Sequence, residues 1–309
     1  MRKRFALVHN ASAGLAVPRL LKGVLAGLRS GGADIVELTT TSAADASAKV
    51  AAIAAARSVD AVIAAGGDGT FRAVATGAAG SDIPVGFVPL GTGNVLAYEL
   101  GQVMRGADLA RGLMHDPVIP VRGGLVNGAP FFLMTGAGFD GRIVADLNYR
   151  TKRLLGRAAY TAPVLKALAA GAQHFDVEVD GKAFDASWVI VTKAAHYGGS
   201  FTLTKDTQLG ADRLVAVIVD AASRTALLHT SLALGLGRLA KPETRPRFVK
   251  VLPAHTVRIG HRVTTAIEVD GDDAGHSPVE VLAHGPVVNV IAPTSYVAGL
   301  TNRHTNHVG

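Results

Sequence analysis

The segment Gly66-Gly67-Asp68-Gly69-Thr70 constrains the fold of this chain more than any other. It directly follows the apolar run 61–65, which is typical of a buried strand. Glycines let the backbone approach an anion closely, and the N–H groups at the start of a helix point toward such a ligand. The pattern therefore predicts a strand, a glycine turn and a helix that together bind phosphate. Glycine and aspartate also form ordinary tight turns, so a turn without a ligand stays open from this segment alone.

Asp68 needs a further explanation, because a lone carboxylate in this turn would repel phosphate. A divalent cation bound by both Asp68 and the phosphates would remove that conflict. We expect the hydroxyl of Thr70 to cap a helix over Phe71–Gly77, because a threonine oxygen accepts a hydrogen bond from an N–H at a helix start.

Expected strands and helices alternate through the first third of the chain. The strands are Phe5–His9, Asp34–Leu38, Asp60–Ala64 and Pro84–Val88, and the helices include Pro18–Arg29, Ala43–Arg57 and one that ends at Leu100. Such alternation predicts a parallel sheet covered on both faces. Ligands bind at the carboxyl ends of the strands in these sheets. Asn10, Gly66–Thr70 and Gly91–Asn94 are therefore expected to meet at one edge.

The pattern changes near Pro117 to short strands separated by turns. The expected strands are Val118–Val121, Phe131–Thr135, Asp176–Val179, Trp188–Val191, Leu214–Val219, Thr256–Ile259 and Ala266–Val269. The pairs Asn127-Gly128 and Asp180-Gly181 are typical of hairpin turns. Helical stretches are expected over Arg153–Ala170 and Ser223–Leu239.

The chain is therefore expected to combine an α/β fold with a mainly β fold. Residues 1–117 form a three-layer α/β domain with a parallel sheet, and residues 118–286 form an antiparallel, sandwich-like domain. Residues 287–303 could return to the first domain.

The formal net charge of +7 predicts anionic partners. Basic residues gather at 150–157 and at 238–250 without interleaved aromatic residues, so we expect no nucleic-acid partner. These clusters favour contact with anionic lipid headgroups or form a solvated basic face. The chain has no cysteine and no apolar stretch of about 18 residues, which predicts a cytoplasmic protein without a membrane span.

Several motifs together resemble one family. Gly66–Thr70 is followed by Val85–Asn94, which reads VGFVPLGTGN, and is preceded by Asn10–Gly14, which reads NASAG. Further landmarks are Thr40 with Asp45-Ala46, Gly138-Phe139-Asp140, Gly156 with Tyr160, Tyr197-Gly198-Gly199 and Asp270-Gly271-Asp272. Their order is similar to that of the diacylglycerol kinase and sphingosine kinase catalytic-domain family, in particular its soluble bacterial lipid kinases.

The resemblance implies ATP- and Mg²⁺-dependent transfer of phosphate to a lipid hydroxyl, with the β-rich domain as the lipid-substrate domain. It implies a nucleotide site made by Asn10, Thr40, Gly66, Gly67, Asp68, Gly69, Thr70, Phe71, Gly91, Thr92 and Asn94. Asp68 would bind the catalytic metal, and Asp272 stands where the family has a glutamate and could hold metal as well. Asp270 would act as the general base, although Asp270-Gly271 is also a strong hairpin signal.

The resemblance also implies a second, structural Mg²⁺ site at Leu209, Asp212 and Leu214. Arg213 replaces the family's glycine there and brings a positive charge beside the ion. Val95 is a further departure, since many bacterial members have aspartate after the Asn of this motif. This puts the identity of the lipid in question.

Three functions remain open from the sequence. The first is a lipid kinase that is peripherally associated with an anionic membrane during turnover. The second is a kinase of a soluble substrate, similar to an NAD kinase, because the Gly-Gly-Asp-Gly turn is shared. The third is a catalytically weakened nucleotide- or lipid-binding protein, which Val95, Asp272 and Arg213 motivate. A homodimer is also left open.

Overall fold

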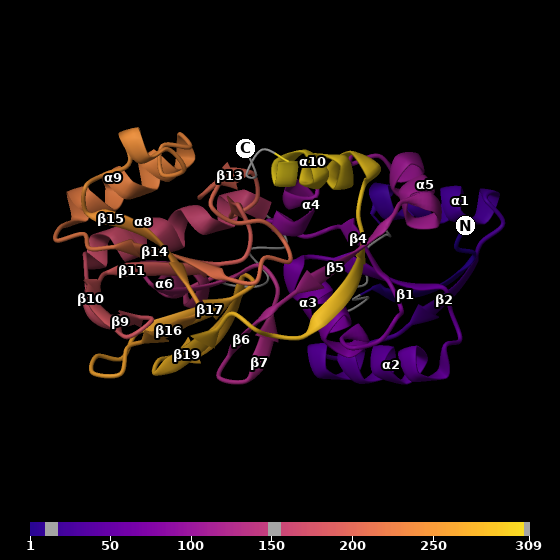
Figure 1. Ribbon diagram of the computed structural model, residues 1–309, viewed down its shortest axis with the longest axis horizontal. Coiled ribbons are helices and arrows are strands. Elements are labelled where there is room, and N and C mark those ends of the chain that lie inside the picture. Colours follow the sequence, from indigo (N-terminus) through magenta and orange to yellow (C-terminus); the bar gives the residue numbers. More distant parts are fainter. Residues whose placement is uncertain (10–17, 148–155, 306–309) are drawn as a thin grey trace. The chain divides into compact units, whose positions relative to one another are not determined.

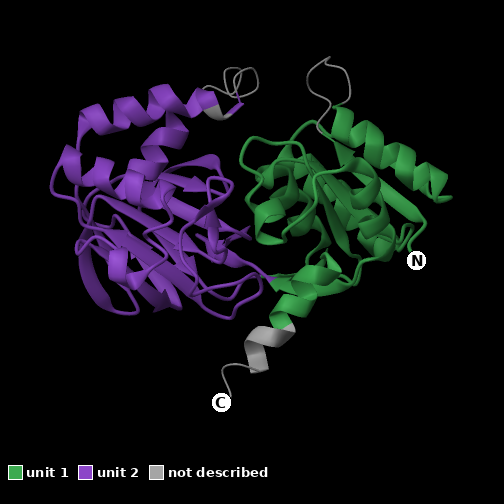
Figure 2. Ribbon diagram, turned by 90° about the horizontal axis from the view of Figure 1, so that it is seen from above, with its two compact units in different colours: residues 1–121, 286–309 green, residues 122–285 purple. Residues whose placement is uncertain are grey.

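The computed structural model describes residues 1–9, 18–147 and 156–305, which belong to two compact units (Figure 1, Figure 2). Unit 1 contains residues 1–121 and 286–309, and unit 2 contains residues 122–285. The chain leaves unit 1 after β5 and returns to it with its last strand, so the β-rich unit is an insertion into the α/β unit.

Unit 1 is built on one six-stranded sheet. Its strands are β1 (Arg4–His9), β2 (Asp34–Leu38), β3 (Ala61–Gly66), β4 (Val85–Pro89), β5 (Val118–Arg122) and β20 (Val287–Ile291), in the order β2-β1-β3-β4-β20-β5. The pairs β1–β2, β1–β3, β3–β4 and β4–β20 are parallel. The carboxyl ends of β2, β1, β3 and β4 therefore lie at one edge, as the sequence predicts.

Helices cover both faces of this sheet. They are α1 (Arg19–Ser30), α2 (Ala43–Ala56), α3 (Asp68–Ala78), the short α4 (Val95–Glu99), α5 (Gly106–His115) and α10 (Thr294–Thr305). Helices α1 and α5 pack together on one side, and α2 and α3 on the other (Figure 1). Leu21 and Leu28 of α1 pack with Phe5, Leu7 and Ile63 of the sheet in a buried core. The expected three-layer α/β architecture is confirmed.

Unit 2 contains two six-stranded antiparallel sheets. One has the order β10-β9-β16-β19-β6-β7 and the other β15-β14-β11-β8-β17-β18. Their strands are β6 (Gly124–Val126), β7 (Ala129–Phe131), β8 (Met134–Gly138), β9 (Phe175–Val179), β10 (Lys182–Ala186), β11 (Trp188–Thr192), β14 (Leu214–Val219), β15 (Val249–Ala254), β16 (Thr256–Ile259), β17 (Ala266–Val269), β18 (Asp272–His276) and β19 (Val279–Leu282). One buried core draws residues from both sheets, among them Val177, Ile259, Val189 and Ile267. The expected sandwich is confirmed.

The remaining elements of unit 2 correct two expectations. They are α6 (Phe139–Ala145), η1 (Gly156–Tyr160), α8 (Thr161–Ala170), β12 (His196–Tyr197), β13 (Phe201–Thr202), α9 (Arg224–Gly235) and η2 (Pro242–Thr244). The single strand expected at 131–135 is wrong, because β7 ends at Phe131 and β8 begins at Met134. The helix expected over 153–170 is divided into η1 and α8, and residues 153–155 lie outside the described part.

Three hairpin turns share one backbone conformation. Asn127, Asp180 and Asp270 have φ values of 46°, 47° and 48°, and the glycine after each has φ 82°. Two consecutive residues with positive φ match the twist of antiparallel strands, and Asn-Gly and Asp-Gly adopt this conformation at least cost. The hairpin predicted at Asp270-Gly271 is therefore present, between β17 and β18.

Candidate active site

The turn at the end of β3 contains Gly66 and Gly67, which have no side chain of their own over the backbone. Gly67 is the N-cap of α3, which begins at Asp68, so the expected cap by Thr70 is wrong. Thr70 instead lies in the first turn of the helix, where a Cβ on Gly66 would overlap its hydroxyl. The first N–H groups of a helix have no acceptor within it, and they carry the positive end of its dipole. The turn can therefore receive an anion at its backbone.

A second glycine turn, after β4, lies directly against the first. A Cβ built on Gly91 would lie only 2.5 Å from the Cα of Gly67, so the two backbones touch at a point where only glycine fits. The N–H of Leu90 donates to the carbonyl oxygen of Gly66 at 2.8 Å. The turns that follow neighbouring parallel strands thus form one surface at the carboxyl edge of the sheet.

Asp68 joins these two turns. Its carboxylate accepts hydrogen bonds from the N–H groups of Val95 at 3.0 Å and Leu96 at 3.2 Å, the first two residues of α4. Asn94, with φ 52°, closes the second turn, because its side chain accepts from Gly91 N–H at 2.9 Å and donates to Gly91 O at 2.7 Å. The position of Val95 is thus fixed through its backbone.

The donor set at Asp68 fits one Mg²⁺ ion that is shared with phosphates. The Asp68 carboxylate, which accepts from the two α4 amides, supplies oxygen ligands of the kind that Mg²⁺ prefers. No cluster of three acidic or histidine side chains that could bind a metal occurs in the described ranges. Magnesium commonly binds through one or two carboxylates and the substrate's phosphates rather than in an all-protein cage.

The loop after β2 contributes Thr40 to the same edge of the sheet. Asp45 fixes this loop, since its carboxylate accepts from Thr41 N–H at 2.9 Å and from Lys49 Nζ at 2.9 Å. The Thr41 N–H is the main reason that the pKa of Asp45 lies below its usual value. Ser42 completes the arrangement as the N-cap of α2, accepting from Asp45 N–H at 3.1 Å.

The other predicted nucleotide residues differ in their surroundings. Gly69 and Thr92 are partly exposed at the two turns. The side chain of Phe71 is 1% exposed and packs against Phe87 at 5.8 Å between ring centroids, so it belongs to the core. Asn10 follows β1 in the sequence and lies outside the described residues.

In unit 2, Asp270 is held by the main chain. Its residue is 4% exposed, and its carboxylate accepts from the N–H groups of Phe132, Leu133 and Met134 at 3.0, 2.9 and 3.0 Å. Asp180, in the equivalent position of another Asp-Gly turn, accepts in the same way from His255 and Thr256. The contacts of Asp270 are those of a residue that anchors a hairpin between two neighbouring segments.

Asp272 lies on the other side of the same turn. It begins β18 and is exposed, unlike Asp270. The N–H of Gly271, between these two residues, donates to Glu268 Oε2 at 2.8 Å, and this hydrogen bond fixes the turn to a side chain of β17. The accessible carboxylate of this motif is therefore that of Asp272.

A buried carboxyl pair adjoins this turn and was not among the site residues predicted from the sequence. Asp140 is 3% exposed and Glu268 is 2% exposed. A Cβ on Gly136 would overlap Asp140 Oδ2 and lie 2.8 Å from Glu268 Oε1, so both oxygens share one small space. The hydroxyl of Tyr197 donates to Asp140 Oδ1. Burial raises the pKa of Asp140 to about 6, which favours a proton shared between the two carboxyls.

The segment expected to hold a structural Mg²⁺, residues 209–214, is contacted by two cationic side chains from elsewhere in the chain. Lys193 is completely buried, and its Nζ donates to the carbonyl oxygen of Ala211 at 2.7 Å. Burial lowers its pKa to about 8, so the amine is still largely charged at neutral pH. Asp212 lies 3.3 Å from Arg122 Nε, with its side chain 82% exposed. Leu209, Asp212 and Leu214 therefore do not fit a hard cation, because an ammonium and a guanidinium already supply positive charge there.

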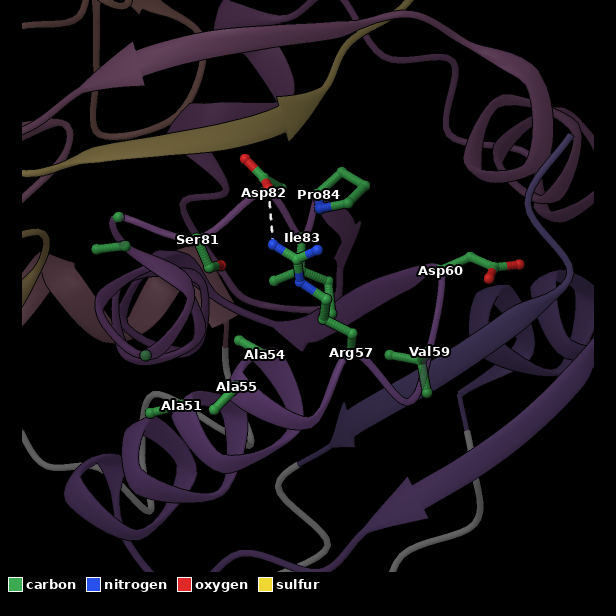
Figure 3. A pocket seen from close by; sticks show the side chains of 13 residues that line it. Ala51, Ala54, Ala55, Arg57, Val59, Asp60, Ser81, Asp82, Ile83 and Pro84 are labelled. Carbon is green, nitrogen blue, oxygen red and sulfur yellow. Dashed lines mark hydrogen bonds and ion pairs between the residues drawn. The ribbon is translucent and has the colours of Figure 1, made fainter.

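A surface hollow in unit 1 lies away from these turns (Figure 3). It is lined by the ends of α2 and α3 and by the segments that lead into β3 and β4, including Arg57, Asp60, Ser81 and Asp82. These segments meet at the amino ends of the strands, opposite the edge where parallel sheets bind ligands. Arg57 and Asp82 form an ion pair at 3.3 Å there, with side chains 83% and 92% exposed, which contributes little to stability.

Two known domain families match this chain, one over most of unit 1 and one over most of unit 2. Residues 4–125 match the diacylglycerol kinase catalytic domain, and residues 134–292 match the YegS C-terminal NAD kinase beta sandwich-like domain. The chain is 26% identical over 301 residues to a diacylglycerol kinase of Bacillus subtilis, covering 94% of this chain and 97% of that one. It is 28% identical over 244 residues to an uncharacterized protein of Synechocystis, covering 75% of this chain and about half (54%) of the relative's length.

A solved structure shows the same fold. The crystal structure of a diacylglycerol kinase from Bacillus anthracis superimposes with a TM-score of 0.70 at 18% identity, covering 95% of this chain and 98% of that one. The chain belongs to the family of diacylglycerol kinases and YegS-like lipid kinases. The expected class, a kinase enzyme, is confirmed. No helix among the described residues is both long and apolar enough to span a bilayer.

Gly91→Ala should separate the two glycine turns. The new methyl group would collide with the Gly67 backbone, and overpacking of this kind costs about 1–3 kcal/mol. We expect the affinity for ATP, measured by calorimetry, to fall by more than about tenfold. Gly235→Ala is the matched control, because its Cβ would meet no atom within 4 Å and it lies on α9 of unit 2. Equal affinities for the two variants would contradict the assignment.

Asp140→Asn tests the carboxyl pair, because the amide imitates a protonated carboxyl that faces Glu268 and accepts from Tyr197. The pKa of Asp140 is raised in the folded protein, so its native state binds the proton more tightly than the unfolded chain. The wild type should lose stability as the pH rises from about 4 through about 6, while the variant should not. The free energy of unfolding in urea, taken as variant minus wild type, should therefore rise toward pH 7 by up to about 3 kcal/mol. A difference that is independent of pH would contradict the shared proton.

Asp212→Asn tests the absence of a metal from the 209–214 segment. The exposed pair with Arg122 predicts a cost below about 1 kcal/mol. Without nucleotide, thermal unfolding of the wild type should have the same midpoint in millimolar Mg²⁺ and in EDTA. A midpoint that Mg²⁺ raises in the wild type but not in Asp212→Asn would show a metal site there.

Proposed function

We propose that this chain transfers the γ-phosphate of ATP to a hydroxyl of a lipid, such as diacylglycerol or a related lipid or long-chain base. The observation that carries the proposal is the contact between Gly67 and Gly91, with Asp68 bonded across both turns. Membership of a lipid kinase family supports the same reaction class. Phosphoryl transfer requires mainly positioning and charge stabilisation, which backbone N–H groups supply.

On the nucleotide side, the backbone of the first turn binds phosphate oxygens in this proposal. The residues are Gly66, Gly67, Gly69 and Thr70, while Thr40, Thr92 and Asn94 border the same edge. Asp68 would hold Mg²⁺. When bound, the ion would neutralise charge that develops on the phosphates. Asn10 and the backbone of Phe71 remain candidates from the resemblance.

On the acceptor side, we assign the proton acceptor to the Asp270-Gly271-Asp272 turn and favour Asp272 within it. A general base must reach the substrate hydroxyl and have room for its proton. Asp272 is exposed, whereas Asp270 is buried and already accepts three backbone hydrogen bonds. Asp270 would then position the turn that carries the base.

The lipid substrate places the reaction at a membrane surface. We therefore propose a cytoplasmic protein that contacts an anionic membrane peripherally during turnover, supported by its net charge of +7. No step of this proposal requires nucleic acid.

Transfer of labelled γ-phosphate to a panel of lipids tests the reaction. We expect Mg²⁺-dependent labelling of at least one lipid and no labelling of NAD. Labelling of NAD alone would favour a kinase of a soluble substrate. Nucleotide binding by folded protein without any labelled product would favour the catalytically weakened binding protein.

Asp272→Asn tests the proton acceptor. Loss of a general base typically reduces turnover by 10²–10⁴-fold, so we expect kcat to fall by about 100-fold or more with an unchanged thermal midpoint. Asp270→Asn should instead lower the midpoint, because its backbone hydrogen bonds weaken. Asp273→Asn is the matched control, since this neighbouring carboxylate is exposed and accepts a hydrogen bond from Gly275 N–H within its own hairpin. If Asp270→Asn removes turnover without a change in stability, Asp270 is the base instead.

A further inference from the structure

Helix α9 of unit 2 exposes a row of leucines that its fold does not require. Leu228, Leu232 and Leu236 are 45%, 57% and 67% exposed. Leu228 and Leu232 lie one turn apart on α9, and Leu236, the C-cap residue that follows the helix, continues the spacing of four. The opposite face packs on the unit through the buried residues Leu227, Thr230, Ala233 and Leu234. We call Leu228, Leu232 and Leu236 the α9 stripe.

The α9 stripe continues onto the neighbouring helix. An apolar hollow between α8 and α9 is lined by Leu168, Ala169, Arg224, Thr225 and Leu228. Leu165, one turn before Ala169 on α8, is 61% exposed. Figure 1 shows α9 along the outside of unit 2. Contiguous exposed apolar surface of this kind marks a binding face.

The chain around the α9 stripe is strongly basic. Residues 224–250 contain six Lys or Arg and a single acidic residue, Glu243. Arg238, Lys241 and Arg247 are exposed, and none of them forms an ion pair with another part of the chain that the structure describes. Apolar residues on one side of a helix with basic residues around it are typical of elements that lie in the interface of an anionic bilayer.

We propose that the α9 stripe inserts into the surface of an anionic membrane, with Arg238, Lys241 and Arg247 on its headgroups. This inference rests on the proposed lipid kinase function and names the surface by which the enzyme reaches its substrate. The charge argues against a second copy of the chain as the occupant. A symmetric dimer through α9 would bring two basic segments of the same sign together, which is unfavourable.

Co-sedimentation of the full chain with vesicles tests the proposal. The vesicles contain phosphatidylcholine alone or with about a third phosphatidylserine, an amount that gives a strongly negative surface. The stripe variant is Leu228→Ser with Leu232→Ser and Leu236→Ser. The matched control is Val36→Ser with Val103→Ser and Met104→Ser, which alters unit 1 residues that are 57%, 54% and 41% exposed. A charge variant combines Arg238→Gln, Lys241→Gln and Arg247→Gln.

We expect binding of the wild type and the control to the anionic vesicles, with binding reduced more than about tenfold in the stripe variant. The charge variant should lose the preference for anionic over neutral vesicles, and binding of the wild type should weaken with salt. Equal binding of stripe variant and control would overturn the proposal. So would a wild-type dimer that the stripe variant converts to a monomer in light scattering.

Activity in detergent separates this inference from the function on which it rests. The stripe variant should phosphorylate lipid dispersed in detergent micelles as the wild type does, with an unchanged thermal midpoint. A wild type that binds anionic vesicles through the α9 stripe but phosphorylates no lipid would overturn the proposed function alone. An active enzyme whose vesicle binding does not depend on the stripe would overturn this inference alone.

Discussion

The hydrogen bonds from the start of α4 to Asp68 determine how the two glycine turns of unit 1 are arranged. They fix the turn after β4 to the turn after β3, at distances of 3.0 and 3.2 Å, and the Gly67–Gly91 contact follows from that closeness. Each glycine is needed where a backbone meets another group, so the motif is a packing requirement of the fold as well as the phosphate site that we propose. A cation bound by both Asp68 and the phosphates would reconcile an acidic residue with a turn that binds phosphate.

Unit 2 also has aspartates that accept backbone N–H groups, and there they anchor segments of the chain to one another. Asp176, Asp180 and Asp270 each accept backbone N–H groups from a neighbouring segment. In the Asp270 turn this anchoring is supported by Glu268, which bonds Gly271 and shares buried space with Asp140. Anchoring leaves Asp272 as the accessible carboxylate of the motif. Beside the segment 209–214, where the sequence resemblance predicts a structural metal, Lys193 and Arg122 supply positive charge instead.

Local patterns predicted the elements that depend on neighbouring residues. The strand, glycine turn and helix at 61–78 and the three Asx-Gly hairpins are set by side-chain alternation and by residues that tolerate positive φ. The carboxyl pair could not be predicted in this way, because Asp140 and Glu268 are brought together only by the pairing of β8 with β17. Lys193 was missed for a similar reason, since only the folded loop shows that its amine meets Ala211. Phe71 and Asp270 are buried, whereas other residues of their motifs are more exposed. The sequence alone does not show which residues of a motif are buried.

We propose that the two glycine turns together form the nucleotide-binding surface of unit 1. Hydrogen exchange of the backbone amides, with and without a non-hydrolysable ATP analogue and Mg²⁺, measures whether both turns respond to the nucleotide. We expect slower exchange in both 66–71 and 90–96 when the nucleotide binds, because amides in the two turns then face bound phosphates or become less mobile. Protection confined to the hollow at 57–60 and 79–84, or protection of one turn without the other, would contradict it.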